Sequence, residues 1–476
     1  MIRYFFETML NSFIEFTIVY YMWANTVYML LLVSAVYAIR KQSRLKPMVD
    51  LVQKAQGAYL PPISIIAPAY NEEATIVESI KSFLLLQYPD YNVIVVNDGS
   101  KDNTLQELER EFRLQKISRK IRSSLSETRV RQVYQSQLHP NLIVIDKENG
   151  GKADALNIGI SASDYDLVCC VDSDSLLEED ALLKVAGPFL ADPEKTIVCG
   201  GTVRVVNGSE VEHGRVTKIR LPDNFLGLLQ VVEYTRSFLC GRTGWNVFNA
   251  TTIISGAFGL FSKKAIMEVG GYRKGSVGED MELIVRLHDH YRRNKKKYSI
   301  VFVPDPVCWT EAPRDLKILR NQRDRWHRGL MEVLSSYKKI FFNRRYGFLG
   351  LLAFPYLVMV ELLEPVIGLF SLAVVAVGIS LGYLEWSLVR EYLLAGVLYS
   401  ILLSVLSIII EEIYFGRYRQ PLQFLALLGA AFCETLFFKY IVSFWRIQGT
   451  IRYFRGGHNW GKMKRTGFRT PVKKAS

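Results

Sequence analysis

The stretch "ISIIAPAYNEE", Ile63–Glu73, is a run of apolar and β-branched residues that passes directly into polar ones. Three later stretches repeat this pattern: "YNVIVVNDGS" (91–100), "NLIVIDKENGG" (141–151) and "DLVCCVDSDS" (166–175). Helical patterns separate them, near residues 72–86, from Thr104 and near residues 152–161. Apolar strands that alternate with helices predict an α/β fold with a mostly parallel sheet and helices on both faces.

Four polar clusters follow these strands: "APAYNEE", "VNDGSKDNT", "KENGGKADALN" and "VDSDS". Taken singly, each is also ordinary turn or helix-cap chemistry. In a parallel sheet, however, ligands bind outside the carboxyl ends of the strands. Glu72, Asp98, Asp172 and Asp174 would converge there and repel one another unless a cation neutralised them.

The segment Asp172-Ser173-Asp174 suits a divalent metal, because it offers two hard carboxylate oxygens close together. Such ligands suit Mg²⁺ or Mn²⁺, which take their remaining ligands from water and substrate phosphates. A nucleotide diphosphate would supply those oxygens. Gly150-Gly151-Lys152 adds a turn and a cation at a helix start, which suits a sugar or phosphate group.

A further acidic pair, Glu279-Asp280, follows a glycine-rich turn in "GSVGEDMELIVRLH" (275–288) and opens an amphipathic helix. Acidic residues favour helix N-termini for electrostatic reasons alone. The functional alternative is a general base, because attack by a sugar hydroxyl needs a carboxylate that accepts the proton. Asp280 is the candidate for that role.

Apolar residues make up 49% of the chain and the mean hydropathy is +0.11, which is high for a soluble protein. Phe16–Ile39 carries no charged side chain, and about 20 such residues cross a bilayer. Three more apolar stretches, at 348–384, 392–410 and 421–445, lie near the C-terminus. The sequence therefore predicts one anchor, a water-soluble domain and a membrane bundle.

The distribution of positive charge predicts which segments lie on the cytoplasmic side of the membrane. The segment "RKQSRLK" (40–46) has cations and no acid, which places it in the cytoplasm and the N-terminus outside. The tail from Arg446 has nine Lys/Arg and no acid, so it is also expected in the cytoplasm. Three simple crossings after the domain would put it outside. Either 348–384 is a hairpin or two segments, or 421–445 lies partly along the interface.

The net charge of +13 does not indicate nucleic-acid binding, because the cations sit mainly beside apolar segments and in "YRRNKKK" (291–297). Attraction to anionic lipid explains that placement better. Within the apolar segments, Glu361, Glu364 and Glu434 would face a polar interior such as a polymer channel. Helix–helix hydrogen bonds or interfacial placement are the alternative, preferred for Glu411 and Glu412. The stretch 107–132 alternates charge along a helical pattern, typical of a solvated helix face.

The ordered motifs, together with "NQRDRWHRG" (321–329), resemble membrane-embedded processive family 2 glycosyltransferases. Hyaluronan, cellulose, chitin and poly-N-acetylglucosamine synthases form this group. Gln322, Arg325 and Trp326 fit its Q-x-x-R-W signature. On charge alone, Arg320, Arg323 and Arg328 would face lipid headgroups.

The resemblance implies a GT-A fold, a UDP-sugar donor, Mg²⁺ or Mn²⁺, and inverting polymerisation of a β-linked polysaccharide. The roles it implies are nucleotide-sugar binding by Ala67, Tyr70, Asn71, Glu72, Asp98, Lys152 and Asp172, metal binding by Asp174, catalysis by Asp280 with Glu279, and acceptor or diphosphate contacts by Gln322, Arg325 and Trp326. Two departures keep UDP-N-acetylglucosamine and UDP-glucose both open. Gly278 stands where cellulose-type enzymes carry threonine, and "GKADALN" differs from the hyaluronan-type "GKR".

The expected division is a transmembrane helix at 1–40, a cytoplasmic GT-A domain at 41–313, amphipathic interface helices at 314–346, transmembrane or interface helices at 347–445 and a basic tail at 446–476. The protein would be a hexosyltransferase of a bacterial-type plasma membrane. Its partners would be the UDP-sugar, the growing polysaccharide and the bilayer, with export subunits unknown. The alternatives are a non-processive transferase that adds one sugar to a lipid phosphate, and a catalytically idle export scaffold.

Overall fold

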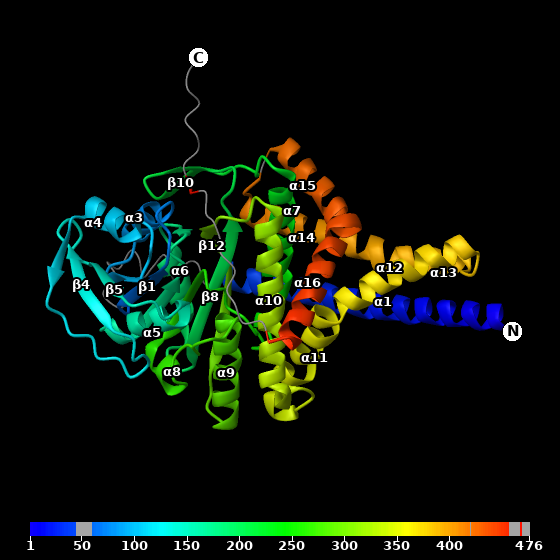
Figure 1. The fold of residues 1–476 in the computed structure, drawn as a ribbon, viewed down its shortest axis with the longest axis horizontal. Helices are drawn as coiled ribbons and strands as arrows, with labels where there is room; N and C mark the ends of the chain where they lie inside the picture. Colours follow the sequence, from blue (N-terminus) through cyan, green and yellow to red (C-terminus); the bar gives the residue numbers. More distant parts are fainter. Residues whose placement is uncertain (44–59, 419, 457–466, 469–476) are drawn as a thin grey trace, which may run out of the picture.

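The computed structural model describes residues 1–43, 60–418, 420–456 and 467–468. An α/β domain lies on one side of the molecule and a helical bundle on the other (Figure 1). The predicted α/β domain, with a mostly parallel sheet and helices on both faces, and the predicted bundle of apolar helices are confirmed.

A ten-stranded sheet forms the centre of the domain, in the order β3-β4-β5-β2-β1-β6-β11-β8-β12-β7. The strands are β1 Ile63–Ala69, β2 Tyr91–Asn97, β3 Leu114–Ile117, β4 Val130–Ser136, β5 Leu142–Lys147, β6 Leu167–Val171, β7 Ser175–Leu177, β8 Thr196–Val205, β11 Phe258–Ser262 and β12 Ser299–Thr310. The four strands β5, β2, β1 and β6 run parallel, as do β8 and β12. The predicted nucleotide-sugar and metal residues lie on or shortly after β1, β2, β5 and β6, and because these strands are parallel they all end at one edge of the sheet. β11 runs antiparallel to both of its neighbours, β6 and β8. A separate two-stranded sheet pairs β9 Glu210–Glu212 with β10 Arg215–Lys218.

The alternation of side chains along β2 explains why both faces of the sheet are covered. Val93 and Val95 belong to one buried cluster with α3 Ile76–Leu84 and α4 Thr104–Phe112. Ile94 and Val96 belong to a second cluster with α5 Lys152–Ala162. Apolar residues at every position of a strand therefore require helices on both sides.

The remaining domain helices are α6 Ala181–Ala191, α7 Phe225–Arg236 with its π-helical continuation η1 Ser237–Gly244, α8 Lys263–Glu268, α9 Glu279–Arg293 and α10 Leu316–Ser336. Short turns η2 Lys338–Ile340 and η3 Arg344–Tyr346 follow α10. The helical interpretation of 107–132 is wrong beyond Phe112. Arg113 is left-handed, with φ of +46°, and the chain then enters β3 and β4. Charge alternation was misleading because one face of an edge strand is also solvated.

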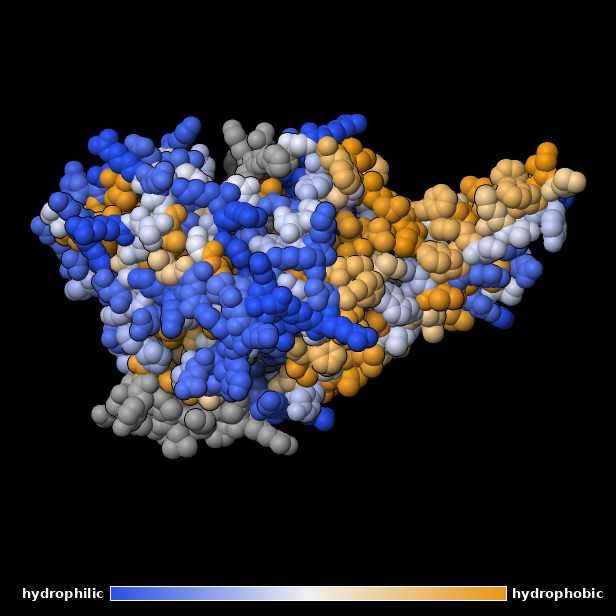
Figure 2. Space-filling model, turned by 90° about the horizontal axis from the view of Figure 1, so that it is seen from below, coloured by the Kyte–Doolittle hydropathy of each residue, from blue (hydrophilic) through white to orange (hydrophobic). Residues whose placement is uncertain are grey.

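The bundle comprises α1 Ile2–Ser43, η4 Leu349–Ala353, α11 Phe354–Tyr356, η5 Leu357–Leu362, α12 Glu364–Leu381, α13 Trp386–Tyr392, η6 Leu393–Leu398, α14 Tyr399–Phe415, α15 Pro421–Cys433, η7 Glu434–Phe438 and α16 Lys439–Phe454. By length and composition, four helices of the described chain could cross a membrane: Ile2–Gln42, Glu364–Leu381, Trp386–Phe415 and Pro421–Phe454. Their apolar surface adjoins the hydrophilic surface of the α/β domain (Figure 2).

The structure shows which helices form in two of the predicted apolar stretches. The stretch 348–384 is a short apolar helix, Leu349–Leu362, followed by one helix, Glu364–Leu381, that is long and apolar enough to cross a membrane. Pro365 suits that position because the first turn of a helix leaves its N–H groups unpaired. The helix Pro421–Phe454 packs on α7 near its start and on α10 near its end. It therefore runs across the domain end of α1 and α12 rather than alongside them (Figure 1).

Candidate active site

The loops that follow β1 and β2 are held together as one unit. The backbone N–H of Asp98 donates to the carbonyl of Ala69 at 2.9 Å, where both strands end. Asn71 has φ of +58°, a conformation that Asn adopts more readily than most residues. Its backbone N–H donates to Ser100 Oγ at 3.0 Å and its Oδ1 accepts from Lys101 N–H at 2.8 Å. Asn71 thus fastens the loop after β1 to the loop after β2.

The other residues predicted in this pocket differ in exposure. Ala67 is fully buried within β1, whereas Tyr70 is 44% exposed. The backbone N–H of Glu72 donates to Thr104 Oγ1 at 2.8 Å. Of this group, Tyr70 is the side chain best placed for stacking on a ligand, while Ala67 can contribute only through its backbone.

The carboxylate of Asp98 holds the glycine loop that leads into α5. Its oxygens accept the backbone N–H groups of Gly150 at 2.9 Å and Gly151 at 2.8 Å. Asn149 Nδ2 donates to it at 3.1 Å, and the ammonium of Lys147 contacts it as well. Gly151 has φ of +87°, which other residues rarely adopt. Asp98 therefore shapes the loop before Lys152, and direct nucleotide contact by its carboxylate stays a prediction.

Lys152 joins two acidic segments that are distant in the sequence. Its Nζ lies 2.6 Å from Asp172 Oδ1 and 3.3 Å from Glu279 Oε1. Burial alone would lower the pKa of Lys152, but Asp172 and Glu279 outweigh it and hold the pKa above its usual value. The cation thus stays charged at the centre of the predicted site, within reach of a phosphate.

The two carboxylates that open α9 have different surroundings. Burial raises the pKa of Glu279, Lys152 opposes this increase, and neighbouring Asp280 adds to it. Asp280 is only half-buried, and its two oxygens accept the backbone N–H groups of Gly256 at 3.2 Å and Met281 at 2.8 Å. Its carboxylate is therefore fixed in orientation and still open to an incoming hydroxyl.

Asp172 and Asp174 lie in the turn between β6 and β7. The backbone N–H of Ser175 donates to the Asp172 carbonyl at 3.1 Å, which tightens this turn. Asp174 is buried, and Asp172 is partly exposed. Within the described ranges, no group of three or more His, Cys, Asp or Glu is arranged to hold a metal ion. The two carboxylates fit Mg²⁺ or Mn²⁺ when a diphosphate supplies further oxygens, as these ions usually require.

The signature residues of α10 differ in their surroundings, and Arg325 is the one near the acidic group. The charge of Arg325 is close enough to Glu279 to oppose the increase in its pKa. Gln322 is buried, and its Oε1 has no hydrogen-bond partner among the described residues. Trp326 is 46% exposed, so an aromatic face is available to a ligand.

The start of α9 packs closely on α10 at two glycines. A Cβ added at Gly278 would lie 3.0 Å from the Cα of Gly329. The backbone N–H of Val277 also donates to Glu332 Oε2 at 2.9 Å, and Glu332 belongs to α10. The glycine at position 278 is thus explained by direct packing of the α9 start on α10.

The expected lipid-facing role is wrong for Arg323 and Arg328, which are 3% and 5% exposed. Arg323 Nη2 lies 2.6 Å from Glu233 Oε2, and its guanidinium carbon sits 4.3 Å from the Trp326 ring centroid. Arg328 Nε lies 3.0 Å from Asp324 Oδ2. The charges face inward because α10 is covered by α7 and α16, which sequence alone did not place.

A cavity of about 170 Å³ lies on the bundle side of α10. It is lined by residues of α1, α7, η5, α12, α14, η7 and α16. Glu233, the partner of Arg323, lines this cavity. Arg323 contacts the Trp326 ring on one side and Glu233 on the other, so this ion pair links Trp326 to the cavity wall.

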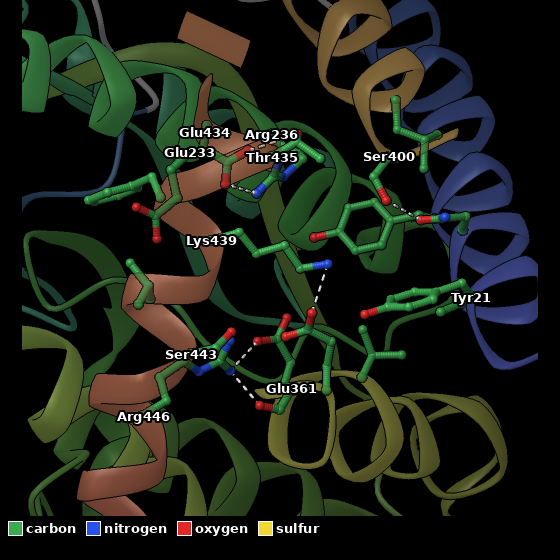
Figure 3. Close-up of a pocket in the computed structure, with 18 of the residues that line it drawn as sticks. Tyr21, Glu233, Arg236, Glu361, Ser400, Glu434, Thr435, Lys439, Ser443 and Arg446 are labelled. Carbon is green, nitrogen blue, oxygen red and sulfur yellow. Dashed lines mark hydrogen bonds and ion pairs between the residues drawn. The ribbon is translucent and has the colours of Figure 1, made fainter. Parts of the chain in front are cut away.

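The cavity wall carries charges in pairs (Figure 3). Arg236 makes two hydrogen bonds of 2.8 Å with Glu434, and Lys439 lies 2.7 Å from Glu364. A third pair joins Arg446 Nη2 to Glu361 Oε2 at 2.9 Å. Glu361, Glu364 and Glu434 thus face a polar interior, as expected. Glu411 pairs with Arg204 and Glu412 accepts the Tyr418 N–H, in keeping with the structural role preferred for them.

Two charged residues near the candidate site, Lys147 and Arg242, were not predicted from the sequence. Lys147 is fully buried, with its Nζ 2.8 Å from Asp154 Oδ2 in addition to its contact with Asp98. Arg242, in η1, has a pKa lowered to about 10 by burial, with Asp280 as the strongest opposing charge. A π-helical segment often marks a functional site, but its sequence "SFLCGRTG" gives no signal.

Comparison with known proteins finds a similar family and similar proteins. The profile of the family "Glycosyl transferase family 2" matches residues 64–270. Poly-beta-1,6-N-acetyl-D-glucosamine synthase of Staphylococcus aureus (strain COL) is 30% identical over 273 residues, 57% of this chain and 55% of that protein. The synthase of the same name from Staphylococcus epidermidis is 29% identical over 285 residues, 60% of this chain and 58% of that protein.

The chain therefore matches little more than half the length of these curated relatives. Among solved structures, a mannosyltransferase from Pyrobaculum calidifontis in complex with GDP-Man and Mn²⁺ has 17% identity and a TM-score of 0.47, over 87% of this chain and 99% of that one. The family match covers β1, β2, β5, β6 and the predicted nucleotide-sugar residues on them. Residues 64–270 match the glycosyl transferase family 2 model, so the chain is similar to this family over 207 of its 476 residues.

Proposed function

We propose that this protein is an inverting, processive glycosyltransferase that polymerises a β-linked polysaccharide from a UDP-sugar. The observation that carries the proposal is the convergence of Lys152, Asp172, Glu279 and Asp280 beside Arg325. The Arg323–Glu233 ion pair then links the adjoining Trp326 to the wall of a polar cavity in the bundle. An enzyme that retains its growing product needs such an adjoining compartment.

In the proposed reaction, the Asp280 carboxylate accepts the proton of the acceptor hydroxyl while the hydroxyl oxygen attacks the anomeric carbon of the donor. The bond from that carbon to the UDP oxygen breaks, and UDP leaves with the electron pair. Lys152 and Arg325 would stabilise the developing negative charge by charge-assisted hydrogen bonds. Mg²⁺ or Mn²⁺, held by Asp174 near Asp172, would neutralise the diphosphate further. Attack opposite the leaving group gives the β-linkage from an α-linked donor.

The names of the two relatives favour one of the two candidate donor sugars. Both are poly-β-1,6-N-acetylglucosamine synthases, so UDP-N-acetylglucosamine is proposed ahead of UDP-glucose. The aromatic face of Trp326 would pack on the acceptor sugar, and Gln322 Oε1 would accept a hydrogen bond from a sugar hydroxyl. Nucleotide-sugar roles for Tyr70, Asn71, Glu72 and Asp98 belong to the same proposal.

The proposed topology follows from the course of the helices. With the N-terminus outside, α1 would cross the membrane into the cytoplasm, α12 would cross it outward, and α13 to α14 would cross it back. The helices α15 to α16 would lie along the cytoplasmic interface. Contacts at both ends of Pro421–Phe454 with the α/β domain support the interfacial placement. The tail from Arg446 then lies in the cytoplasm, as its positive charge favours. Residues 457–466 and 469–476 of this tail lie outside the described residues.

The division at 1–40, 41–313, 314–346, 347–445 and 446–476 is proposed with a cytoplasmic catalytic domain in a bacterial-type plasma membrane. Export of the polymer would use the cavity that Arg236, Lys439 and Arg446 line. Paired charges suit this role because a saccharide can replace their mutual hydrogen bonds with its own hydroxyl groups.

The test uses purified full-length protein with UDP-N-acetylglucosamine or UDP-glucose, with Mg²⁺ or Mn²⁺ and in chelator. The proposal predicts metal-dependent release of UDP from UDP-N-acetylglucosamine and a polymer that β-specific hydrolases digest. Absence of turnover with either donor would support the idle scaffold. A product one sugar longer than a lipid phosphate acceptor would instead identify the non-processive transferase.

A further inference from the structure

A second hollow, of about 460 Å³, lies at the end of α9 that is remote from Glu279 and Asp280. Its wall is built where α9 ends and where β8 and β12 begin, with η3 alongside. The lining residues are Lys195, Asn249, Arg292, Lys295, Lys296, Lys297, Tyr298 and Arg345. This wall contains six cations and no acidic residue.

The cations are held in place by ordinary backbone and side-chain contacts. Arg345 Nη2 donates to the carbonyl of Arg293 at 2.7 Å, which caps the last turn of α9. Arg292 Nε donates to the Tyr298 hydroxyl at 3.0 Å. Lys295 follows the helix with φ of +51°, so the chain reverses there and brings the lysines back toward β12. The basic cluster is thus a consequence of how α9 ends.

Neighbouring acids neutralise only part of this charge. Lys195 lies 2.9 Å from Asp192 Oδ2, and Lys296 lies 2.9 Å from Glu268 Oε2. Among the ion pairs of the described residues, none involves Arg292, Lys295, Lys297 or Arg345. Four positive charges around one hollow repel one another, so a bound anion would relieve that repulsion.

Exposed apolar side chains lie close in sequence to residues that line the hollow. Asn249 and Arg345 line it, and each lies close in sequence to exposed apolar residues: Val247 at 40%, Phe348 at 49%, Leu351 at 39% and Leu352 at 48% exposed. The rings of Phe248 and Phe348 are 5.0 Å apart, which joins the two segments. In Figure 2, which shows this end of the molecule from below, the hydrophilic surface meets the apolar surface of the bundle.

We propose that this hollow binds the headgroup phosphate of an anionic phospholipid, with the acyl chains along Phe348, Leu351 and Leu352. The cations match the phosphate, and the apolar flank matches the chains. A free nucleotide or inorganic phosphate would use only the cations and leave the apolar flank without a partner. The bound lipid would fix the height and tilt of the α/β domain against the bilayer.

The test is lipid binding to the full-length protein in neutral detergent, measured by native mass spectrometry with phosphatidylglycerol and phosphatidylcholine. The triple variant Lys295→Gln, Lys297→Gln and Arg345→Gln removes charge from the hollow. A matched control, Lys116→Gln, Lys120→Gln and Arg122→Gln, removes three exposed cations on and after β3, at the other end of the sheet. Inorganic pyrophosphate serves as the lipid-free competitor.

Wild type and control should bind phosphatidylglycerol in preference to phosphatidylcholine, and the hollow variant should lose at least about tenfold in affinity, since each basic residue near a lipid surface contributes appreciably. Equal binding of phosphatidylglycerol by the hollow variant and wild type would overturn the proposal. Displacement of the lipid by equimolar pyrophosphate would also overturn it and identify a free anion as the ligand.

Discussion

Lys152 is the residue on which the site is centred, because it contacts carboxylates from two separate motifs. A cation between Asp172 and Glu279 allows both to remain close together without a bound metal. In the proposed reaction, Lys152 would exchange an aspartate oxygen for a phosphate oxygen of the donor at little electrostatic cost. Donor binding would then be linked to the organisation of the acidic cluster through this one side chain.

Replacement of Asp280 by Asn tests the proposed base. The amide has similar size but accepts no proton, so transfer should fall by about 10²-fold to 10⁴-fold, the usual contribution of a general base. UDP affinity should change by less than about twofold, because Asp280 has no proposed contact with the nucleotide. Steady-state UDP release and UDP titration measure the two quantities.

Asp164→Asn is the matched control, because this aspartate is exposed and pairs with Arg119 away from the site. It should leave both quantities unchanged. Transfer by Asp280→Asn at half the wild-type rate or more would exclude Asp280 as the base.

His288 predicts a pH dependence of stability. It is fully buried, its ring nitrogens contact the Tyr298 hydroxyl at 2.6 Å and the Thr251 carbonyl at 2.9 Å, and burial lowers its pKa to about 4. The unfolded chain takes up a proton below pH 6.5 and the folded chain does not until about pH 4. Stability should therefore fall on acidification through this window, by about 2 kcal/mol at pH 5.

Thermal unfolding of the detergent-solubilised protein between pH 7 and pH 5 measures this slope. His288→Gln keeps a donor and an acceptor in place but cannot titrate, so its melting temperature should depend less on pH. An identical pH slope in wild type and His288→Gln would contradict the account.

At the scale of elements, α10 connects the acidic cluster with the bundle. One part of it meets the start of α9 at Gly329, and another meets α16 at Gly449. Because Gln322, Arg325 and Trp326 lie on this helix, small shifts of α10 would move all three relative to Asp280. The helix is thus expected to control acceptor positioning rather than donor binding.

Gly449→Leu tests that expectation. A Cβ at Gly449 would lie 3.1 Å from the carbonyl oxygen of Asp324, so leucine should displace α16 from α10. Transfer should fall by about tenfold or more, since ångström-scale misplacement of reacting groups costs up to 10²-fold, while UDP affinity is kept. UDP release with and without added acceptor measures the effect.

Gly429→Leu is the control on the same long helix, because nothing lies within 4 Å of an added Cβ there. It should behave as wild type. Equal transfer rates in the two leucine variants would show that α10 positioning does not limit the reaction.

The same elements show how far the sequence could predict the structure. The β-branched runs predicted β1, β2, β5 and β6, and "GED" predicted the start of α9, because these signals are local. The inward orientation of Arg323 and Arg328 was not predictable, because it depends on α7 and α16, which are distant in the sequence. The hydrogen bonds from the backbone N–H groups of Gly150 and Gly151 to the Asp98 carboxylate were not predictable either, because they depend on two strands that end at the same edge of the sheet.

At the scale of the whole molecule, the cavity lies between the α/β domain and the bundle. Ser443 lines it and is 3% exposed, whereas Ser380 on α12 points outward. Ser443→Trp should obstruct the cavity, so the first transfers should proceed at a normal rate and the products should be shorter. Gel analysis of labelled products measures their length.

Ser380→Trp adds the same side chain on the exposed face and should give products of wild-type length. Both variants should elute as wild type in gel filtration. Full-length products from well-folded Ser443→Trp would argue against a polymer route through this cavity.

The most direct test of processive polymerisation is a pulse–chase with purified full-length protein. Radiolabelled UDP-N-acetylglucosamine is supplied briefly and is then diluted with a large excess of unlabelled donor. If the growing chain stays bound between Trp326 and the cavity, the label must move during the chase into progressively longer polymers. Label that remains in acceptors extended by a single sugar would contradict the account.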